Sequence, residues 1–280
     1  MELVGQRNKP KITVIRPSGG LAIPDLREVW ENRELIYFFA WRELKVRYKQ
    51  TALGAAWAVI QPLLTTVIFT IFFGDLAKMP SEGVPYIVFV YAALVPWTYF
   101  SNSITNAGNS LVAQQSIITK VYFPRLVIVL GTTCAGLLDF AIAFIVELLI
   151  LPFYGIRLSP FILSIPLLII FTAACSLAVG LWLAALDVLY RDVKVAVTFL
   201  VQFWLFATPI AYASSIVPQR WRALYGINPM VAVVEAFRWA TLSTALDPWQ
   251  MLVSGTIVSL LLIGGLIYFK RVERILADIV

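Results

Sequence analysis

Four uncharged polar residues recur at helical spacing inside an otherwise apolar stretch. They occupy positions i, i+3, i+4 and i+7 of one helix face, and they are Asn102, Thr105, Asn106 and Asn109. Amide and hydroxyl groups can donate and accept hydrogen bonds. The face can therefore exchange hydrogen bonds with the hydroxyl groups of a passing ligand. Alternatively it joins neighbouring helices, where each such bond contributes about 0.6 kcal/mol in a membrane.

Aromatic residues gather toward the ends of the same stretch and of a second one. They are Trp97, Tyr99, Phe100, Phe203, Trp204, Phe206 and Tyr212. Flat rings can stack on a ligand and offer it a smooth surface. Trp and Tyr also collect at membrane–water interfaces without any ligand, so both interpretations stay open.

Asp139 and Glu147 are the acidic residues deep inside an apolar stretch, where a charged group is costly. We expect them to pair with an arginine of a neighbouring span, to face a wet cavity, or to position helices as paired or protonated carboxyls. The chain has no histidine, which removes imidazole metal sites and Ser–His triads. It also lacks a GxxxxGK[ST] phosphate loop, so we do not expect it to hydrolyse ATP alone or to act as an enzyme.

The polar residues stand within six apolar stretches, each providing about the 20 residues that cross a hydrocarbon core of roughly 30 Å. The stretches are 53–73, 86–111, 126–153, 161–186, 193–212 and 249–269. A hydrophobic content of 60%, a mean hydropathy of +0.83 and 14% charged residues fit a polytopic membrane protein rather than a soluble domain. The predicted fold class is all-α, with six transmembrane helices.

The basic residues predict how the chain is oriented. If both termini are cytoplasmic, all but five of the 22 Lys and Arg residues fall on the cytoplasmic side. The exceptions are Lys78, Arg157, Arg220, Arg222 and Arg238. The positive-inside rule favours this arrangement, and contact with anionic membrane lipids explains the net charge of +6 without nucleic acid.

The segment before the first stretch divides into two parts. We expect residues 1–24 to form a flexible cytoplasmic arm and residues 25–51 to form an amphipathic interface helix, opened by a capping box at Asp25. Its apolar stripe is Leu26, Trp30, Tyr37, Trp41 and Leu44. This stripe suits a helix lying in the membrane interface or one packed on a soluble partner. Residues 52–280 then form the transmembrane domain.

The turn between the second and third stretches is a candidate docking element. Its apolar residues Ile117, Ile118, Val121 and Tyr122 form a compact face, and Pro124 stops the helix. A short cytoplasmic helix of this kind can fit a groove on a soluble subunit. Alternatively it caps the two adjoining spans against lipid.

The segment 213–248, between the fifth and sixth stretches, is too polar to span and too aromatic to float free. We expect a pair of short extracytoplasmic re-entrant helices separated by Pro229, dipping into the outer interface. The alternative is a simple surface hairpin.

Several short motifs appear in the order of a known family. They are Lys120-Val121-Tyr122-Phe123-Pro124-Arg125, the run 42–51 followed by 53–57 and Gln61-Pro62, Tyr190-Arg191-Asp192-Val193, and Asn228-Pro229-Met230 followed by Phe237-Arg238. With the six stretches they cover almost the whole chain from about residue 25. The chain resembles the permease subunits of type-2 ABC exporters, which include O-antigen, capsule and teichoic-acid permeases.

The resemblance implies an assembly and a role. It implies a homodimer with two copies of a separate cytoplasmic ABC ATPase, which holds the ATP and Mg, while this chain binds no cofactor. The cargo would be a lipid-linked polysaccharide, with O-antigen the first candidate, crossing the bacterial inner membrane. The alternatives are a capsule or teichoic-acid permease, a small-molecule or drug permease, or an intramembrane lipid-modifying enzyme.

The resemblance also implies roles for the residues above. The expected ATPase-coupling residues are Ile117, Ile118, Lys120, Val121, Tyr122 and Phe123. The expected substrate path is lined by Trp97, Tyr99, Phe100, Asn102, Thr105, Asn106, Asn109, Phe203, Trp204 and Tyr212.

Overall fold

The computed structural model describes residues 26–49, 54–190 and 192–279, and within these ranges the regular structure is helical. Five helices there are long and apolar enough to cross a membrane: Gly54–Leu76, Tyr86–Ala113, Leu126–Phe153, Pro160–Leu189 and Pro248–Glu273. The prediction of an all-α polytopic membrane protein is confirmed. The 1–24 arm and the cap at Asp25 lie outside the described residues.

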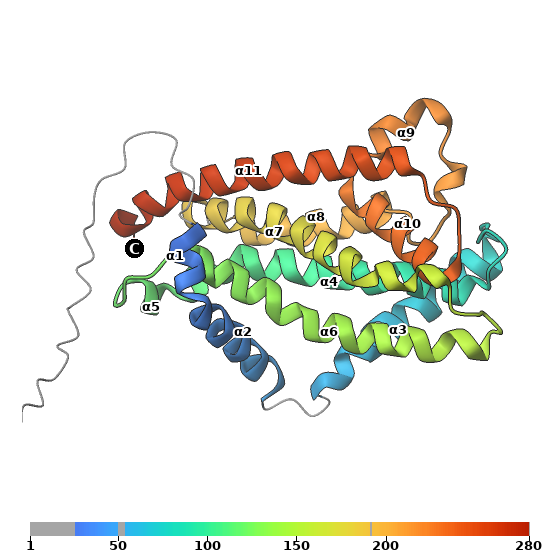
Figure 1. The fold of residues 1–280 in the computed structure, drawn as a ribbon, viewed down its shortest axis with the longest axis horizontal. Coiled ribbons are helices and arrows are strands. Elements are labelled where there is room, and N and C mark those ends of the chain that lie inside the picture. The colour runs from blue at the N-terminus through green and yellow to red at the C-terminus, as the bar shows by residue number, and fades with distance from the viewer. Residues whose placement is uncertain (1–25, 50–53, 191, 280) are drawn as a thin grey trace, which may run out of the picture.

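The five long segments lie side by side along the long axis of the molecule (Figure 1). The first contains the α-helix α3 (Trp57–Phe69) and a π-helical continuation, η2 (Thr70–Leu76). The next are α4 (Tyr86–Ala113) and α6 (Leu126–Phe153). The last two contain α7 (Ile165–Leu189), entered through η3 (Pro160–Ser164), and α11 (Pro248–Ile279).

Helix α4 is the central helix of the bundle. Of its most apolar window 78% is buried inside the protein, against 17% to 33% for the other four segments. It packs against α3, α6, α7, α8 and α10. Polar side chains on α4 therefore face other parts of the protein rather than lipid, which is the condition for them to line an internal site.

The prediction of six spans is not confirmed, because the expected span 193–212 forms a shorter helix. Helix α8 (Val193–Ala207) has 15 residues, or about 22 Å at 1.5 Å per residue, which is less than a hydrocarbon core of roughly 30 Å. It ends where Thr208 turns to an extended conformation before Pro209, which disfavours helix in the residue before it. The chain then continues through the interior, with Ile210 fully buried.

Residues 213–248 do form two short helices separated at Pro229, but the second is not at the surface. After η4 (Ser214–Ile216) come α9 (Gln219–Tyr225) and α10 (Pro229–Leu242). The Asn228 side chain caps α10 by accepting a hydrogen bond from the Met230 N–H at 3.0 Å. All but one residue of α10 is buried, so this helix belongs to the core rather than to the outer interface.

Hydrogen bonds to backbone carbonyls explain how the charged residue Arg238 can be buried in α10. Its guanidinium donates to the carbonyls of Phe89 at 3.1 Å, Pro209 at 2.6 Å and Ile210 at 2.9 Å. It also lies 3.4 Å from the centroid of the Phe89 ring. The arginine thus supplies donors to the extended chain after α8 and ties it to α4 and α10.

The predicted interface helix is divided into α1 (Leu26–Glu31) and α2 (Arg33–Tyr48), with a break at Asn32. Helix α2 packs on α6, where Gly131 allows the approach: a Cβ there would lie 2.7 Å from the Cβ of Phe39. Along the opposite side the side chains of Trp30, Tyr37 and Trp41 are exposed.

Short connections define the two ends of the bundle. The α5 end carries α5 (Gln115–Ile118) and the C-terminal end of α11, and the α9 end carries α9 and α10 (Figure 1).

Candidate functional site

A polar cavity of about 270 Å³ lies among α2, α3, α4 and α6. Its uncharged polar lining consists of Tyr48, Gln61, Thr98, Tyr99, Asn102 and Asn106, and its charged lining is Arg47 and Asp139. Trp57 and Phe140 add aromatic surface. The cavity therefore offers amide and hydroxyl groups beside flat rings. We call it the α4 cavity.

The α4 cavity lies level with the start of the first membrane-crossing segment. Gly54, the first residue of that segment, lines it together with Asp139, 13 residues into α6 from Leu126. The cavity therefore lies beside the start of the first segment and about halfway along α6.

Asp139 takes its partners from α2. Its carboxylate accepts hydrogen bonds from the Arg47 guanidinium and the Tyr48 hydroxyl, and Arg47 also lies 3.3 Å from the Glu43 carboxylate. The prediction that Asp139 pairs with an arginine or faces a cavity is confirmed in both parts, except that the arginine comes from α2 and not from a neighbouring span. The pair fixes the C-terminal end of α2 to the cavity wall.

Replacing Asp139 with Leu should destabilise the protein by about 1–3 kcal/mol. Removing one partner of a buried ion pair is strongly destabilising, and the partial exposure of Arg47 and Asp139, 25% and 18%, reduces the effect here. The midpoint of thermal unfolding in detergent measures it. The double variant Arg47→Met with Asp139→Leu should recover part of the loss, because no charge is then left unpaired. If it is less stable than either single variant, the pair is not the cause.

Glu147 differs from Asp139, since it is buried and not beside the cavity. Its exposed fraction is 1%, and neither carboxyl oxygen has a hydrogen-bond partner within the described part of the chain. The expectation that it pairs with an arginine is wrong for the described residues.

The predicted polar face divides into two pairs. Asn102 and Asn106 line the α4 cavity. Thr105 donates to the carbonyl of Ser101 at 2.8 Å, and Asn109 donates to that of Thr105 at 2.9 Å. These two bond to their own helix, so the part of the face available to a ligand is Asn102 and Asn106.

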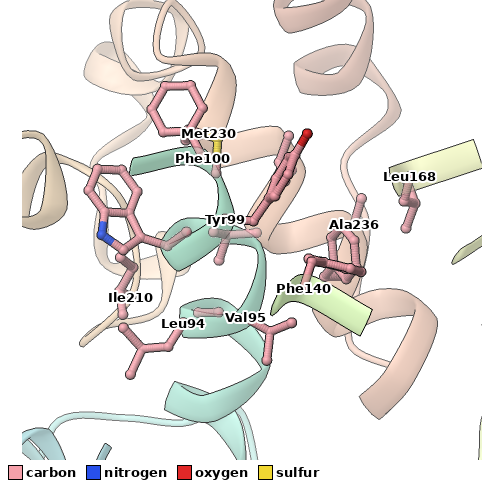
Figure 2. Packing of buried hydrophobic residues seen from close by; sticks show 14 of the residues in the cluster. Leu94, Val95, Tyr99, Phe100, Phe140, Leu168, Ile210, Met230 and Ala236 are labelled. Atoms are coloured by element: carbon pink, nitrogen blue, oxygen red, sulfur yellow. The ribbon is translucent and has the colours of Figure 1, made fainter. Parts of the chain in front are cut away.

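The aromatic residues are divided in a similar way. Tyr99 lines the α4 cavity and packs edge-on against Phe140, with ring centroids 5.8 Å apart (Figure 2). Trp97 and Phe100 are instead buried in the core, Phe100 in an edge contact with Trp204. Their position does not support the prediction that they line a path.

The other three predicted aromatic path residues lie on or after α8. Phe203 is 74% exposed, Trp204 donates to the side-chain oxygen of Asn228 at 2.8 Å, and Tyr212 donates to the Phe206 carbonyl at 3.1 Å. None of the three lines the α4 cavity.

Sequence reasoning missed the cavity residues contributed by the other helices. Gln61 could have been identified as a candidate site residue, since it is an amide inside an apolar span. Arg47 and Tyr48 stood in a family motif, but nothing in their spacing indicated that they meet Asp139.

The turn that follows α4 has a buried side and an exposed side. Ile118 and Phe123 are each 7% exposed, and Phe123 packs on Phe39 of α2 with ring centroids 5.6 Å apart. Val121 and Tyr122 are 57% and 69% exposed. The predicted compact face is therefore split: Ile118 and Phe123 hold the turn in place, and Val121 and Tyr122 point outward.

Polar contacts fix the same turn to two further elements. Gln114 accepts a hydrogen bond from Arg42 of α2. At its other end Arg125 donates to the backbone carbonyl of Glu273 in α11 at 2.6 Å, and Lys270 lies 2.8 Å from the Glu273 carboxylate. A force applied to the turn will therefore act on α2 and α11 together.

A second hollow, of about 360 Å³, lies at the α9 end, and we call it the outer hollow. Its charged lining is Glu82, Arg222, Glu235 and Asp247. Glu235 is 8% exposed, and burial raises its pKa to about 7 while the nearby Arg238 opposes that shift. Asp247 accepts a hydrogen bond from the Trp249 N–H at 3.0 Å. This cluster was not predictable from residue spacing, because its residues come from separate loops and helices.

Comparison with known proteins shows similarity to O-antigen export permeases and to a polysialic acid transport protein. It is 28% identical to the O-antigen export system permease protein RfbA of Klebsiella pneumoniae over 88% of this chain and 95% of that protein. It is 28% identical to RfbA of Myxococcus xanthus over 76% of this chain and 82% of that protein. It is 23% identical to the polysialic acid transport protein KpsM of Escherichia coli over 85% of this chain and 93% of that protein.

The family match covers most of the transmembrane region. The model of the ABC-2 type transporter membrane family matches residues 34–242, which include α2, the α4 cavity, the turn after α4 and α10. Such a chain is the membrane subunit of a transporter, and the nucleotide-binding subunit is a separate protein. The chain belongs to the ABC-2 type transporter family, as one of its permease subunits.

Proposed function

We propose that this chain is the membrane subunit of an exporter that moves a lipid-linked polysaccharide, with O-antigen the first candidate, across the bacterial inner membrane. The observation that carries the proposal is the α4 cavity, where Asn102, Asn106 and Gln61 meet the rings of Tyr99 and Trp57. Amides exchange hydrogen bonds with sugar hydroxyls without holding a chain in one place, and rings stack on sugar faces. The export names of the relatives support the same cargo class.

In this proposal the α5 end is cytoplasmic, with both termini on that side. Basic side chains of the described residues gather there, among them Arg42, Arg125 and Lys270. An excess of Lys and Arg on the cytoplasmic side is the rule for membrane proteins. In this orientation the α4 cavity, which is lined in part by α2, would receive from the cytoplasmic side a cargo assembled inside the cell.

The working complex contains two copies of this chain and two copies of a cytoplasmic ATPase, which binds ATP and Mg. The exposed residues Lys120, Val121 and Tyr122 contact the ATPase, while Ile118 and Phe123 anchor the turn. Motion of the turn is passed to α2 through the Phe123–Phe39 contact. The other end of α2 carries Arg47, whose partner Asp139 is part of the cavity wall, so nucleotide-driven motion reaches the cargo site.

The proposal is tested in a strain that makes a lipid-linked polysaccharide and lacks its own export permease. Expression of this chain with its ATPase should restore surface polysaccharide, which is measured by labelling intact cells. The same pair with an ATPase unable to hydrolyse ATP should leave the lipid-linked polymer inside. Polymer that stays inside with the active pair would contradict the proposal. Resistance to hydrophobic drugs gained in that case would favour a small-molecule permease.

A further inference from the structure

The one cation of the α4 cavity's described lining is paired with carboxylates. Arg47 is the cation of its lining, and its guanidinium lies against the carboxylates of Asp139 and Glu43. The remaining polar groups of the lining are uncharged amides and hydroxyls. Among the described residues, the cavity lining thus has no spare positive charge to offer a ligand.

Helices α3, α4 and α6 carry no basic residue, and of the basic residues on α2 only Arg47 lines the cavity. Between Gly54 and Ala113 the sequence contains one basic residue, Lys78, which lies in the loop after η2. Residues 195–219, which include α8 after its first turn and the chain that follows it, contain no charged residue. A polymer moving along α3, α4 or α8 would meet hydrogen-bonding and aromatic groups but no cation.

The outer hollow has an excess of negative charge. Three carboxylates, those of Glu82, Glu235 and Asp247, line it with one guanidinium, that of Arg222. If Glu235 is protonated, the two remaining carboxylates still outnumber the single arginine. The nearby Arg238 has its donors committed to three backbone carbonyls. The lining of the outer hollow therefore disfavours anions.

We propose that the cargo is an uncharged polysaccharide, and that chains with a carboxylate or phosphate in each repeat are rejected. The inference rests on the proposed function and adds the chemical class of the glycan. Paths that conduct anions are lined by Arg and Lys, because an uncompensated charge is costly in a low-dielectric passage. Here the cation of the α4 cavity is paired with carboxylates, and the surplus charged groups of the outer hollow are acidic. A neutral chain needs only hydrogen-bond exchange and ring contacts, which the cavity provides.

The test uses the purified permease–ATPase complex in vesicles with its ATPase outward. Two cargoes are compared: a lipid-linked neutral homopolysaccharide, and the same preparation after oxidation of its primary alcohols to carboxylates. ATP-dependent entry into the lumen is measured as protection from added periodate. We expect the oxidised chain to enter at less than a tenth of the rate of the neutral chain. Entry of both at similar rates, or of the oxidised chain alone, overturns the inference and leaves polysaccharide export standing. Entry of neither contradicts the proposed function itself, and the inference with it.

A charge variant assigns the selectivity to this chain rather than to the ATPase. Asn106→Lys adds a cation to the cavity wall and should raise the entry rate of the oxidised chain relative to the neutral one at least fivefold. Asn106→Gln adds length without charge and should leave that ratio where it was. If both variants give the original ratio, the α4 cavity does not set the charge of the cargo.

Discussion

Replacing Asn106 with Trp should lower the delivery of polysaccharide to the cell surface at least tenfold and leave lipid-linked polymer inside. Asn106 lines a cavity of about 270 Å³, and an indole in place of an amide fills much of the space in which a sugar could lie. Asn106 is only half-buried, so the larger side chain can be accommodated in the cavity without displacing the core. Surface labelling of intact cells, together with the amount of lipid-linked polymer in the membrane fraction, measures the effect.

The matched control for added bulk is Ile170→Trp. Ile170 lies on α7 with an exposed fraction of 66%, away from the α4 cavity, so the variant should export normally.

In a chain without Cys134 and Cys175, a cysteine at Asn102 should react with a water-soluble thiol reagent during turnover. Normal export by Asn106→Trp together with an inert cysteine at position 102 would mean that this face only packs helices and that the sugar passes elsewhere.

Hydrophobic pattern alone was enough to predict most of the fold. The long apolar runs gave the five membrane-crossing segments because span length is set by bilayer thickness. The pattern failed at 193–212, where composition is apolar but Thr208 and Pro209 end the helix. It failed again at α10, which was expected to lie in the outer interface and is buried in the core. Burial there depends on three backbone carbonyls from distant elements, and periodicity does not report such partners.

The candidate site could be predicted only in part. Helical spacing placed Asn102 and Asn106 on one face, but it also included Thr105 and Asn109, which bond to their own helix. Residue spacing shows which side chains share a helix face, but it does not show which other groups those side chains contact. The contribution of α2 was not predictable in this way, since the contact between Arg47 and Asp139 joins residues 92 positions apart. Only tertiary structure brings them together.

The double variant Val121→Asp with Tyr122→Asp should abolish co-purification of the permease with its ATPase and stop export. Both side chains are exposed, at 57% and 69%, and apolar groups exposed on an anchored turn suit a hydrophobic groove on a partner. Two carboxylates would have to be desolvated in that groove, which strongly disfavours binding. The permease itself should remain folded, because Ile118 and Phe123, which hold the turn against α2, are unchanged.

The comparison variant is Ser116→Asp, which adds a charge to the exposed side of the short helix α5 in the same turn. This variant should still bind the ATPase. Ile118→Asp is a poor substitute for the double variant, since Ile118 is buried and its loss would disturb the turn directly. Pull-down of the ATPase by tagged permease measures assembly, and the thermal unfolding midpoint of the permease in detergent reports folding. A double variant that is folded, retains its ATPase and exports normally would show that the ATPase binds a different surface of the permease. In that case the connection from this turn through α2 to Asp139 could not be the route by which ATP hydrolysis reaches the cavity.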